Sequence, residues 1–357
     1  MRRAIDSFAL AAILLASLSA CVNNTNQAVD GGLQLDASLE LDASHDAAAA
    51  SDAGPDAHSA DAAELDAGPL DESVTLPQEI RDAVPDLYVA QQTRRVSIYV
   101  RPSTSLSAAE VEHFLNAATD ALTYNQNHLA LSAEEIANEP RIRVVVLNRS
   151  SYTAATGSPD SYGVSFPAYG DDVDALVVKD DALSNLADFD DTLAHEINHV
   201  LIGRRAVDDT YIPWWVIEGT AVDMGANYAW EVHHAWTTFK EYWDEATGDD
   251  ATTTFARYDL EDLTSDSNEL AHDQAISGFF VEYLRFIHEH DGAHGYPDVH
   301  PRFLAASIAT SEGASFAMAF GANFDGLTLA NAKEAYRAFL QSTIASPSAR
   351  YAGTVFE

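Results

Sequence analysis

The segment His195-Glu196-Ile197-Asn198-His199 holds residue types that bind a metal ion and activate a water molecule. On a helix, side chains four positions apart lie on one face, with Cβ atoms about 5–6 Å apart. Two imidazoles at that spacing can bind one zinc ion together, and Glu196 can reach a water on that ion without binding the metal itself. The alternative is a surface helix that carries two unrelated histidines.

A second segment offers a third ligand. Gly203 is suited to end the first helix, and after a loop the chain continues Pro213-Trp214-Trp215-Val216-Ile217-Glu218-Gly219-Thr220-Ala221. Proline is favoured at the start of a helix. If this second helix runs back against the first, it can present Glu218 to the same metal. Two histidines, one glutamate and a water would make the open site expected of a zinc hydrolase.

Together the two segments resemble the gluzincin metallopeptidases, particularly the peptidase-MA-like group, which carry His-Glu-x-x-His followed by Trp-x-x-Glu-Gly-x-Ala. The resemblance covers roughly residues 94–343. It implies one Zn²⁺ ion bound by His195, His199 and Glu218, with Glu196 as the catalytic base. It also implies a peptide or protein as the substrate.

The motifs do not settle the groups around such a site. Asp191, one turn before His195, is suited to accept the outer ring N–H of a zinc ligand, or to favour the start of a helix through its dipole. Asp223 follows Glu218 by five positions, whereas the thermolysin branch of the family has its supporting Asp at four. The candidates for stabilising an oxyanion are Tyr228, His272 and Tyr283.

Two other functions stay open at this stage. The chain could be a non-catalytic binding lipoprotein that keeps a zincin fold at a surface, although Glu196 would then have no role. It could also be a structural zinc protein, which would need a fourth protein ligand where the motif leaves a position for water. A His-rich stretch at residues 288–300 favours a solvated loop over a second metal site.

The elements that must position these residues predict an α+β fold. Alternating apolar residues predict four strands, at 94–100, 142–147, 164–166 and 175–178. A capping box, Ser107-Ala108-Ala109-Glu110, begins a helix that continues to about Leu122. From about residue 188 onward the pattern is helical, with segments at 190–203, 214–228, 276–287 and 329–340.

We therefore expect a domain at 73–357, with a small mixed β-sheet subdomain at about 73–188 and a mainly helical subdomain at about 189–345. The resemblance implies that this arrangement is a gluzincin-like zincin fold.

The N-terminal residues predict export. Two arginines precede an apolar run at 8–18, which suits the core of a signal peptide but is too short to span a bilayer. Leu18-Ser19-Ala20-Cys21 resembles a bacterial lipobox, so we expect a signal peptide at 1–20 and lipidation of Cys21. Ordinary cleavage after Ala20 is the alternative. Val22 in place of Asp favours the outer membrane or cell surface of a bacterium.

Residues 21–72 predict a disordered tether, because they are rich in Asp and Ala and poor in residues that could form a core. Calcium binding by the Asp repeats is an alternative, but they match no known calcium loop. The formal net charge of −37 disfavours nucleic acid and anionic lipid as partners. We expect membrane contact only through the lipid. The single cysteine excludes a site built from several thiolates.

Overall fold

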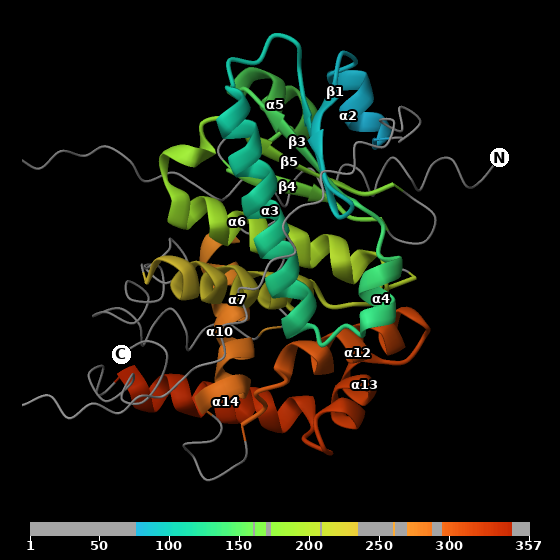
Figure 1. The fold of residues 1–357 in the computed structure, drawn as a ribbon. Helices are drawn as coiled ribbons and strands as arrows, with labels where there is room; N and C mark the ends of the chain where they lie inside the picture. The colour runs from blue at the N-terminus through green and yellow to red at the C-terminus, as the bar shows by residue number, and fades with distance from the viewer. Residues whose placement is uncertain are drawn as a thin grey trace, which may run out of the picture.

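The computed structural model of this chain describes residues 76–159, 161–168, 173–207, 209–234, 260, 270–287 and 295–344. The predicted signal peptide, Cys21 and the predicted tether lie outside these residues. Within them, a five-stranded mixed sheet with its helices lies over a second group of helices (Figure 1). The predicted α+β class is confirmed. Within the described residues, no helix combines the length and apolar character needed to cross a bilayer.

The sheet has the strand order β1-β2-β3-β5-β4. The central strands β2, β3 and β5 run parallel, while β1 and β4 pair antiparallel at the two edges. The strands are β1 Tyr88–Gln92, β2 Val96–Val100, β3 Ile142–Leu147, β4 Gly163–Phe166 and β5 Ala175–Lys179. The four predicted strands are present. β1 escaped prediction because its exposed and half-buried residues lack a clear alternation of apolar and polar types.

Helices cover both faces of the sheet. The long helix α3, Ala108–His128, begins at the predicted capping box, in which Ser107 and Glu110 bond each other's backbone N–H. Three short helices were not predicted, because six to eight residues give too few turns for a periodic signal. They are α2 Gln78–Ala83, α4 Ala133–Asn138 and α5 Arg149–Thr156, and a 3₁₀ turn, η1 Ala182–Ser184, follows β5.

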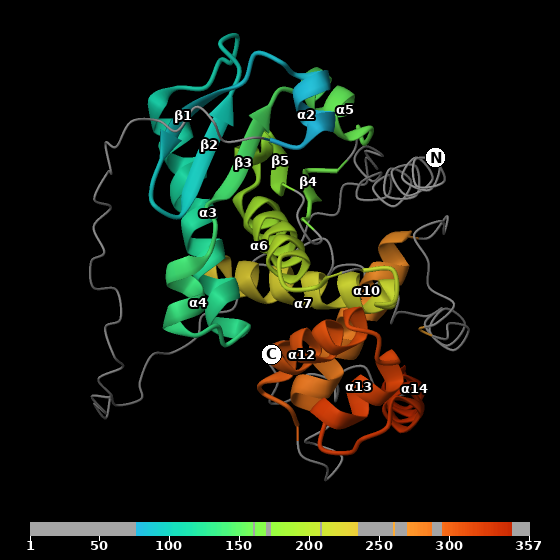
Figure 2. The same cartoon turned by 90° about the vertical axis from the view of Figure 1, so that its right-hand side faces the viewer.

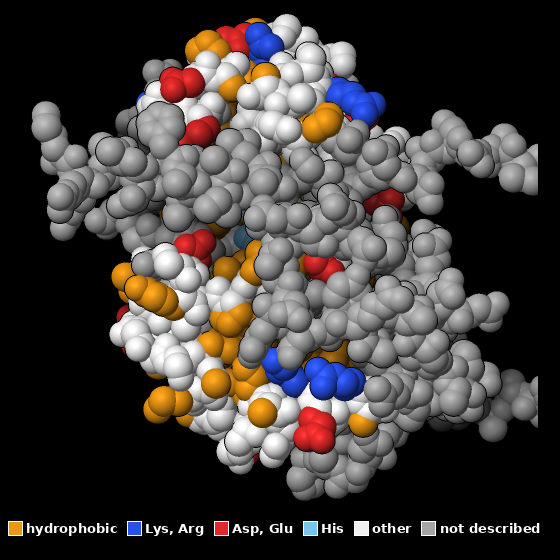
Figure 3. Space-filling model, turned by 180° about the vertical axis from the view of Figure 1, so that it is seen from behind, with side chains coloured by type: hydrophobic (Ala, Val, Ile, Leu, Met, Phe, Trp, Pro, Cys, Tyr) orange, Lys and Arg blue, Asp and Glu red, His pale blue; other side chains and the backbone are white. Residues whose placement is uncertain are grey.

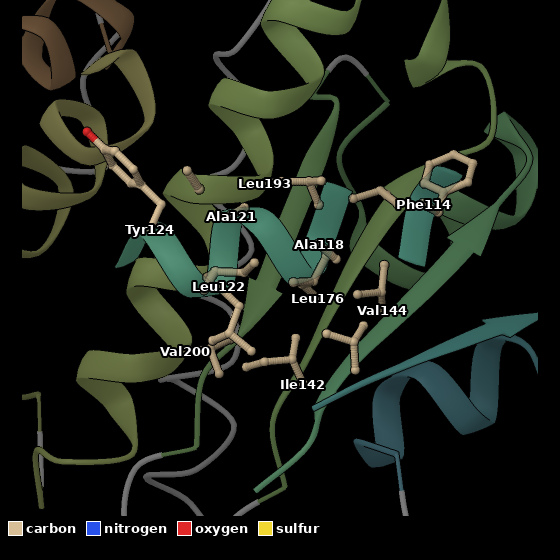
Figure 4. Close-up of a cluster of buried hydrophobic side chains, with 14 of the residues drawn as sticks. Phe114, Ala118, Ala121, Leu122, Tyr124, Ile142, Val144, Leu176, Leu193 and Val200 are labelled. Atoms are coloured by element: carbon tan, nitrogen blue, oxygen red, sulfur yellow. The ribbon is translucent and has the colours of Figure 1, made fainter. Parts of the chain in front are cut away.

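Alternate side chains of β3 point to opposite faces of the sheet and contribute to two separate cores. Ile142, Val144 and Val146 belong to the core between the sheet and helices α3 and α6, Leu186–Gly203 (Figure 4). Val145 and Leu147 belong to a separate core against α2 and α5. Helix α6 follows the sheet in sequence and packs into its main core.

The remaining helices form a second layer below α6 (Figure 2). They are α7 Trp214–His233, α10 Leu270–Glu282, the π-helical turn η3 Tyr283–Ile287, α12 Val299–Ser311, α13 Phe316–Asn323 and α14 Leu329–Ile344. Their core surrounds Trp215, whose ring meets Phe280, Phe303 and Phe316 edge-on at centroid distances of 5.4, 6.3 and 5.6 Å. Such pairs add to the stabilisation from apolar burial.

Candidate metal centre

Helix α6 presents its two faces to different neighbours. Phe189, Leu193, Ile197 and Val200 are fully buried in the core beneath the sheet, at the spacing of one helical face. His195 and His199 lie four residues apart on the side that meets Glu218 of α7. The apolar stripe therefore fixes the direction in which the two imidazoles point.

Asn198, inside the motif, fixes the rotation of α6 further. Its amide donates to Asn125 Oδ1 of α3 over 3.2 Å, and its Oδ1 accepts from Thr220 Oγ1 of α7 over 3.4 Å. Asn125 in turn donates to the carbonyl of Ala194 over 3.0 Å. Buried amides left without partners are costly, so this network favours a single orientation of α6 between α3 and α7.

Gly225 allows α7 to lie close against α6. A Cβ atom at this position would lie 2.3 Å from Asp191 Oδ1 and 3.2 Å from His195 Cβ. A larger side chain would force the two helices apart in the turn that carries His195. The close packing brings residues of α7 within reach of the imidazoles.

Three atoms that can bind a metal ion converge between α6 and α7. His195 Nε2 lies 3.0 Å from His199 Nε2, and Glu218 Oε2 lies 3.6 Å from the first and 3.7 Å from the second. Ligands about 2.0–2.1 Å from a tetrahedral zinc ion are separated by about 3.3 Å. The triangle therefore has the size that a tetrahedral ion requires. The structure brings together the three residues predicted to bind zinc.

Glu196 lies in the same group. One ligand atom from each of His195, Glu196 and His199 lies within 4.8 Å of the others, and all three residues are buried. Glu196 also lies against edge strand β4, where a Cβ atom at Gly163 would be 3.3 Å from Glu196 Cγ, and nearby Ser165 opposes the effect of burial on the pKa of the Glu196 carboxyl. The two carboxylates thus flank the imidazoles. A single oxygen of Glu218 approaches both Nε2 atoms.

Burial sets the charge states of this group. It lowers the pKa of His195 and of His199, so both imidazoles keep the unprotonated nitrogen that a metal requires. It raises the pKa of Glu196, and raises that of Glu218 to about 7, against the opposing hydrogen bond from Gln274. A bound cation would favour the ionised form of both carboxylates. The donor set therefore fits a divalent ion that accepts nitrogen and oxygen ligands.

The other predicted site residues have different surroundings. Asp191 is buried against Gly225, and its role as an acceptor for a zinc ligand stays a prediction. Asp223 instead faces His300 of α12, with Oδ2 and Nε2 3.0 Å apart. His300 is buried in that helix, so its predicted place in a solvated loop is wrong. A histidine amid glycine and proline suggested a loop, whereas the helix around it depends on tertiary packing.

The three candidates for stabilising an oxyanion do not form a set. Tyr228 packs in the core against the ring of Tyr124, with centroids 4.9 Å apart. Tyr283 is fully buried against Tyr336, with centroids 5.3 Å apart. The side chain of His272 lies outside the described residues. Neither tyrosine belongs to the His195–Glu218 group as described.

Sequence reasoning missed two residues that contact the carboxylates. They are Ser165 of β4 and Gln274 of α10, whose Nε2 donates to Glu218 Oε2 over 2.9 Å. A polar residue before the apolar run of α10 was the only signal for Gln274. Ser165 carried none, because serine alternating with apolar residues is ordinary in an edge strand.

The group is enclosed without being sealed. His195, Glu196 and His199 each keep 7% of their surface exposed. In Figure 3 a small part of a histidine side chain is visible at the surface between the upper and lower parts of the molecule, with hydrophobic side chains below it. In comparisons with known proteins, no family model and no curated sequence matches this chain.

Proposed function

We propose that this protein is a zinc-dependent peptidase of the gluzincin type, with a zincin fold. The observation that carries the proposal is the triangle of His195 Nε2, His199 Nε2 and Glu218 Oε2, with sides of 3.0, 3.6 and 3.7 Å. These residues would hold one Zn²⁺ ion. Three protein ligands leave a position for water, which is typical of catalytic zinc sites.

The ion would supply a lowered pKa for water and a positive charge toward the scissile carbonyl. Glu196 is the base that takes the proton of the attacking water and passes it to the leaving amine. Its burial supports this role, because a raised pKa makes a carboxylate a better proton acceptor. Ser165 of the sheet favours the charged form of this carboxyl and so opposes the effect of burial on its pKa.

The edge position of β4 supports a peptide as substrate. Among the described residues the strand pairs with β5 alone, and a Cβ atom at its Gly163 would lie 3.3 Å from Glu196 Cγ. An unpaired edge of a sheet can bind an extended peptide by adding it as another strand. Such a peptide would pass beside the proposed base.

The test compares the parent protein with Glu196→Gln on a mixed peptide library, with products read by mass spectrometry. We expect cleavage by the parent alone, with the variant slower by about 10²–10⁴-fold. Zinc content, measured on both proteins, should be equal. Equal turnover by the variant would contradict the role of Glu196. Zinc binding with no cleavage by either protein would instead favour the non-catalytic binding lipoprotein.

The proposal includes the location of the enzyme. Export by residues 1–20 and lipidation of Cys21 would place the domain at a bacterial surface, on the tether formed by residues 21–72. The mass of the mature N-terminal peptide checks this, since an acylated Cys21 is expected. An unmodified N-terminus elsewhere in the chain would contradict it.

A further inference from the structure

Helices α7 and α10 approach each other closely beside the proposed ligand. A Cβ atom at Gly219, the residue after Glu218, would lie 2.7 Å from the carbonyl oxygen of Ser277. A Cβ atom at Gly278 would lie 2.5 Å from Val222 Cγ1. Each helix therefore places a glycine against the other, and their axes come nearer than larger residues would allow.

This crossing determines which residue of α10 reaches Glu218. Gln274, Ser277 and Gly278 are three and four positions apart and so lie on one face of α10. That face meets α7, and Gln274 Nε2 donates to Glu218 Oε2 over 2.9 Å. Gln274 is 5% exposed, so the bond is shielded from water.

We infer that Gln274 is a positioning residue for the metal centre, which holds the Glu218 carboxylate toward the two imidazoles. The inference rests on the proposed function, since it treats Glu218 as a ligand. The bonded oxygen is the same one that lies 3.6 and 3.7 Å from the two Nε2 atoms. Without this bond the carboxylate could rotate away from them.

The chemistry of an amide suits this role. A glutamine donates a hydrogen bond without adding charge, so it neither repels a cation nor neutralises the ligand. A lysine or arginine in its place would form an ion pair with Glu218 and compete with the metal. Partners of this kind typically change metal affinity by about 10–100-fold when removed.

The test measures zinc affinity of the full chain by competition with a chromophoric chelator. Gln274→Met keeps the approximate volume and removes the donor, whereas Gln274→Glu keeps the shape and adds a like charge. The matched control is Ser277→Ala on the same face of α10, because among the described residues the Ser277 hydroxyl bonds the carbonyl of Asp273 in its own helix, over 2.7 Å, and no other group. We expect affinity to fall about 10–100-fold in both Gln274 variants and to change less than about twofold in the control.

Two further readouts separate positioning from a general packing role. The visible spectrum of the Co²⁺-substituted protein reports the ligand geometry, and it should change in Gln274→Met but not in Ser277→Ala. Thermal unfolding of the metal-free proteins shows whether each variant remains folded. Parent-like affinity and spectrum in a folded Gln274→Met would overturn the inference while leaving the proposed function intact. A parent protein that binds no zinc would overturn both.

Discussion

Helix α6 carries two buried polar groups that differ in how their charges are arranged. At its C-terminal end, Arg204 contacts Asp174 over 2.7 Å and Glu139 over 2.9 Å, and Arg205 contacts Glu139 over 2.5 Å. Every charge in this cluster faces an opposite charge. In the middle of the helix, two imidazole nitrogens and a carboxylate oxygen, all of them atoms that can bind a metal ion, lie 3.0–3.7 Å apart.

The difference separates a structural cluster from a functional one. The Arg204 cluster joins the end of α6 to the start of β5 and the end of α4, and Arg143 adds a third arginine beside Asp174, so both of its acids are paired within the protein. The central group brings together three atoms that can each bind a cation, and burial keeps both imidazoles unprotonated. A sequence that keeps such an arrangement is consistent with an ion supplied from outside. The comparison predicts that the two groups respond differently to mutation and to metal.

The largest effect on stability is expected from a mutation in the Arg204 cluster. Arg204→Met leaves Asp174 and Glu139 buried with less compensation, since both carboxylate side chains are only 6% exposed. Removing one partner of a buried ion pair costs about 3–5 kcal/mol. We expect a loss of this size in the free energy of unfolding in urea, with little change in zinc affinity.

A more exposed pair gives the matched control. Arg101 and Asp86 are 2.9 Å apart, but their side chains are 33% and 42% exposed. Water screens this pair, so Arg101→Met should lose far less stability. Equal losses in the two variants would show that burial does not distinguish the Arg204 cluster.

The next effect is the change in stability on zinc binding to the central group, formed by His195, His199 and Glu218. A ligand that binds only the folded state stabilises it by about 2.7 kcal/mol at a hundredfold excess over Kd. We expect zinc to stabilise the parent in this way and a chelator to reverse the gain. His199→Leu should lose the zinc-dependent gain while its metal-free stability stays close to that of the parent.

The reason is that burial lowers the pKa of His199, so its imidazole is neutral in the metal-free protein and gains little from the charge of nearby Glu218. A His199→Leu protein that still gains stability from zinc would show that the three donors are not the ligand set. Conversely, Arg204→Met should keep the full zinc-dependent gain. If zinc stabilised the His199→Leu and Arg204→Met proteins equally, the proposed difference between the two groups would be wrong.

The sequence predicts the two groups unequally. The central group was predicted from spacing, because four positions along a helix and a following Glu-Gly segment place donors on facing surfaces. The Arg204 cluster had no such signal. Its acids lie at residues 139 and 174, and only the paths of α4 and β5 bring them to α6. The same limit hid Ser165 and Gln274, since each reaches its carboxylate through tertiary packing.

Fold prediction had the same division. Four of the five strands and the capping box of α3 follow from local pattern. The packing of α6 into the core of the sheet and the burial of His300 in α12 do not, because both depend on neighbours distant in sequence.

The smallest effect should sharpen the assignment of Glu196. The hydroxyl and the backbone N–H of Ser165 both favour the charged form of the Glu196 carboxyl and so lower its pKa, and Ser165→Ala removes only the first. A hydrogen bond to a charged group contributes about 1.5 kcal/mol, so turnover should fall roughly tenfold. Zinc affinity should not change, because Ser165 lies beside the base and not beside the three atoms proposed to bind zinc.

The control variant Ser165→Thr keeps a hydroxyl and suits a strand, so it should restore most of the activity. Peptide cleavage measured beside zinc affinity would then separate the base from the ligands, whereas a parallel loss of both in Ser165→Ala would place Glu196 among the metal donors.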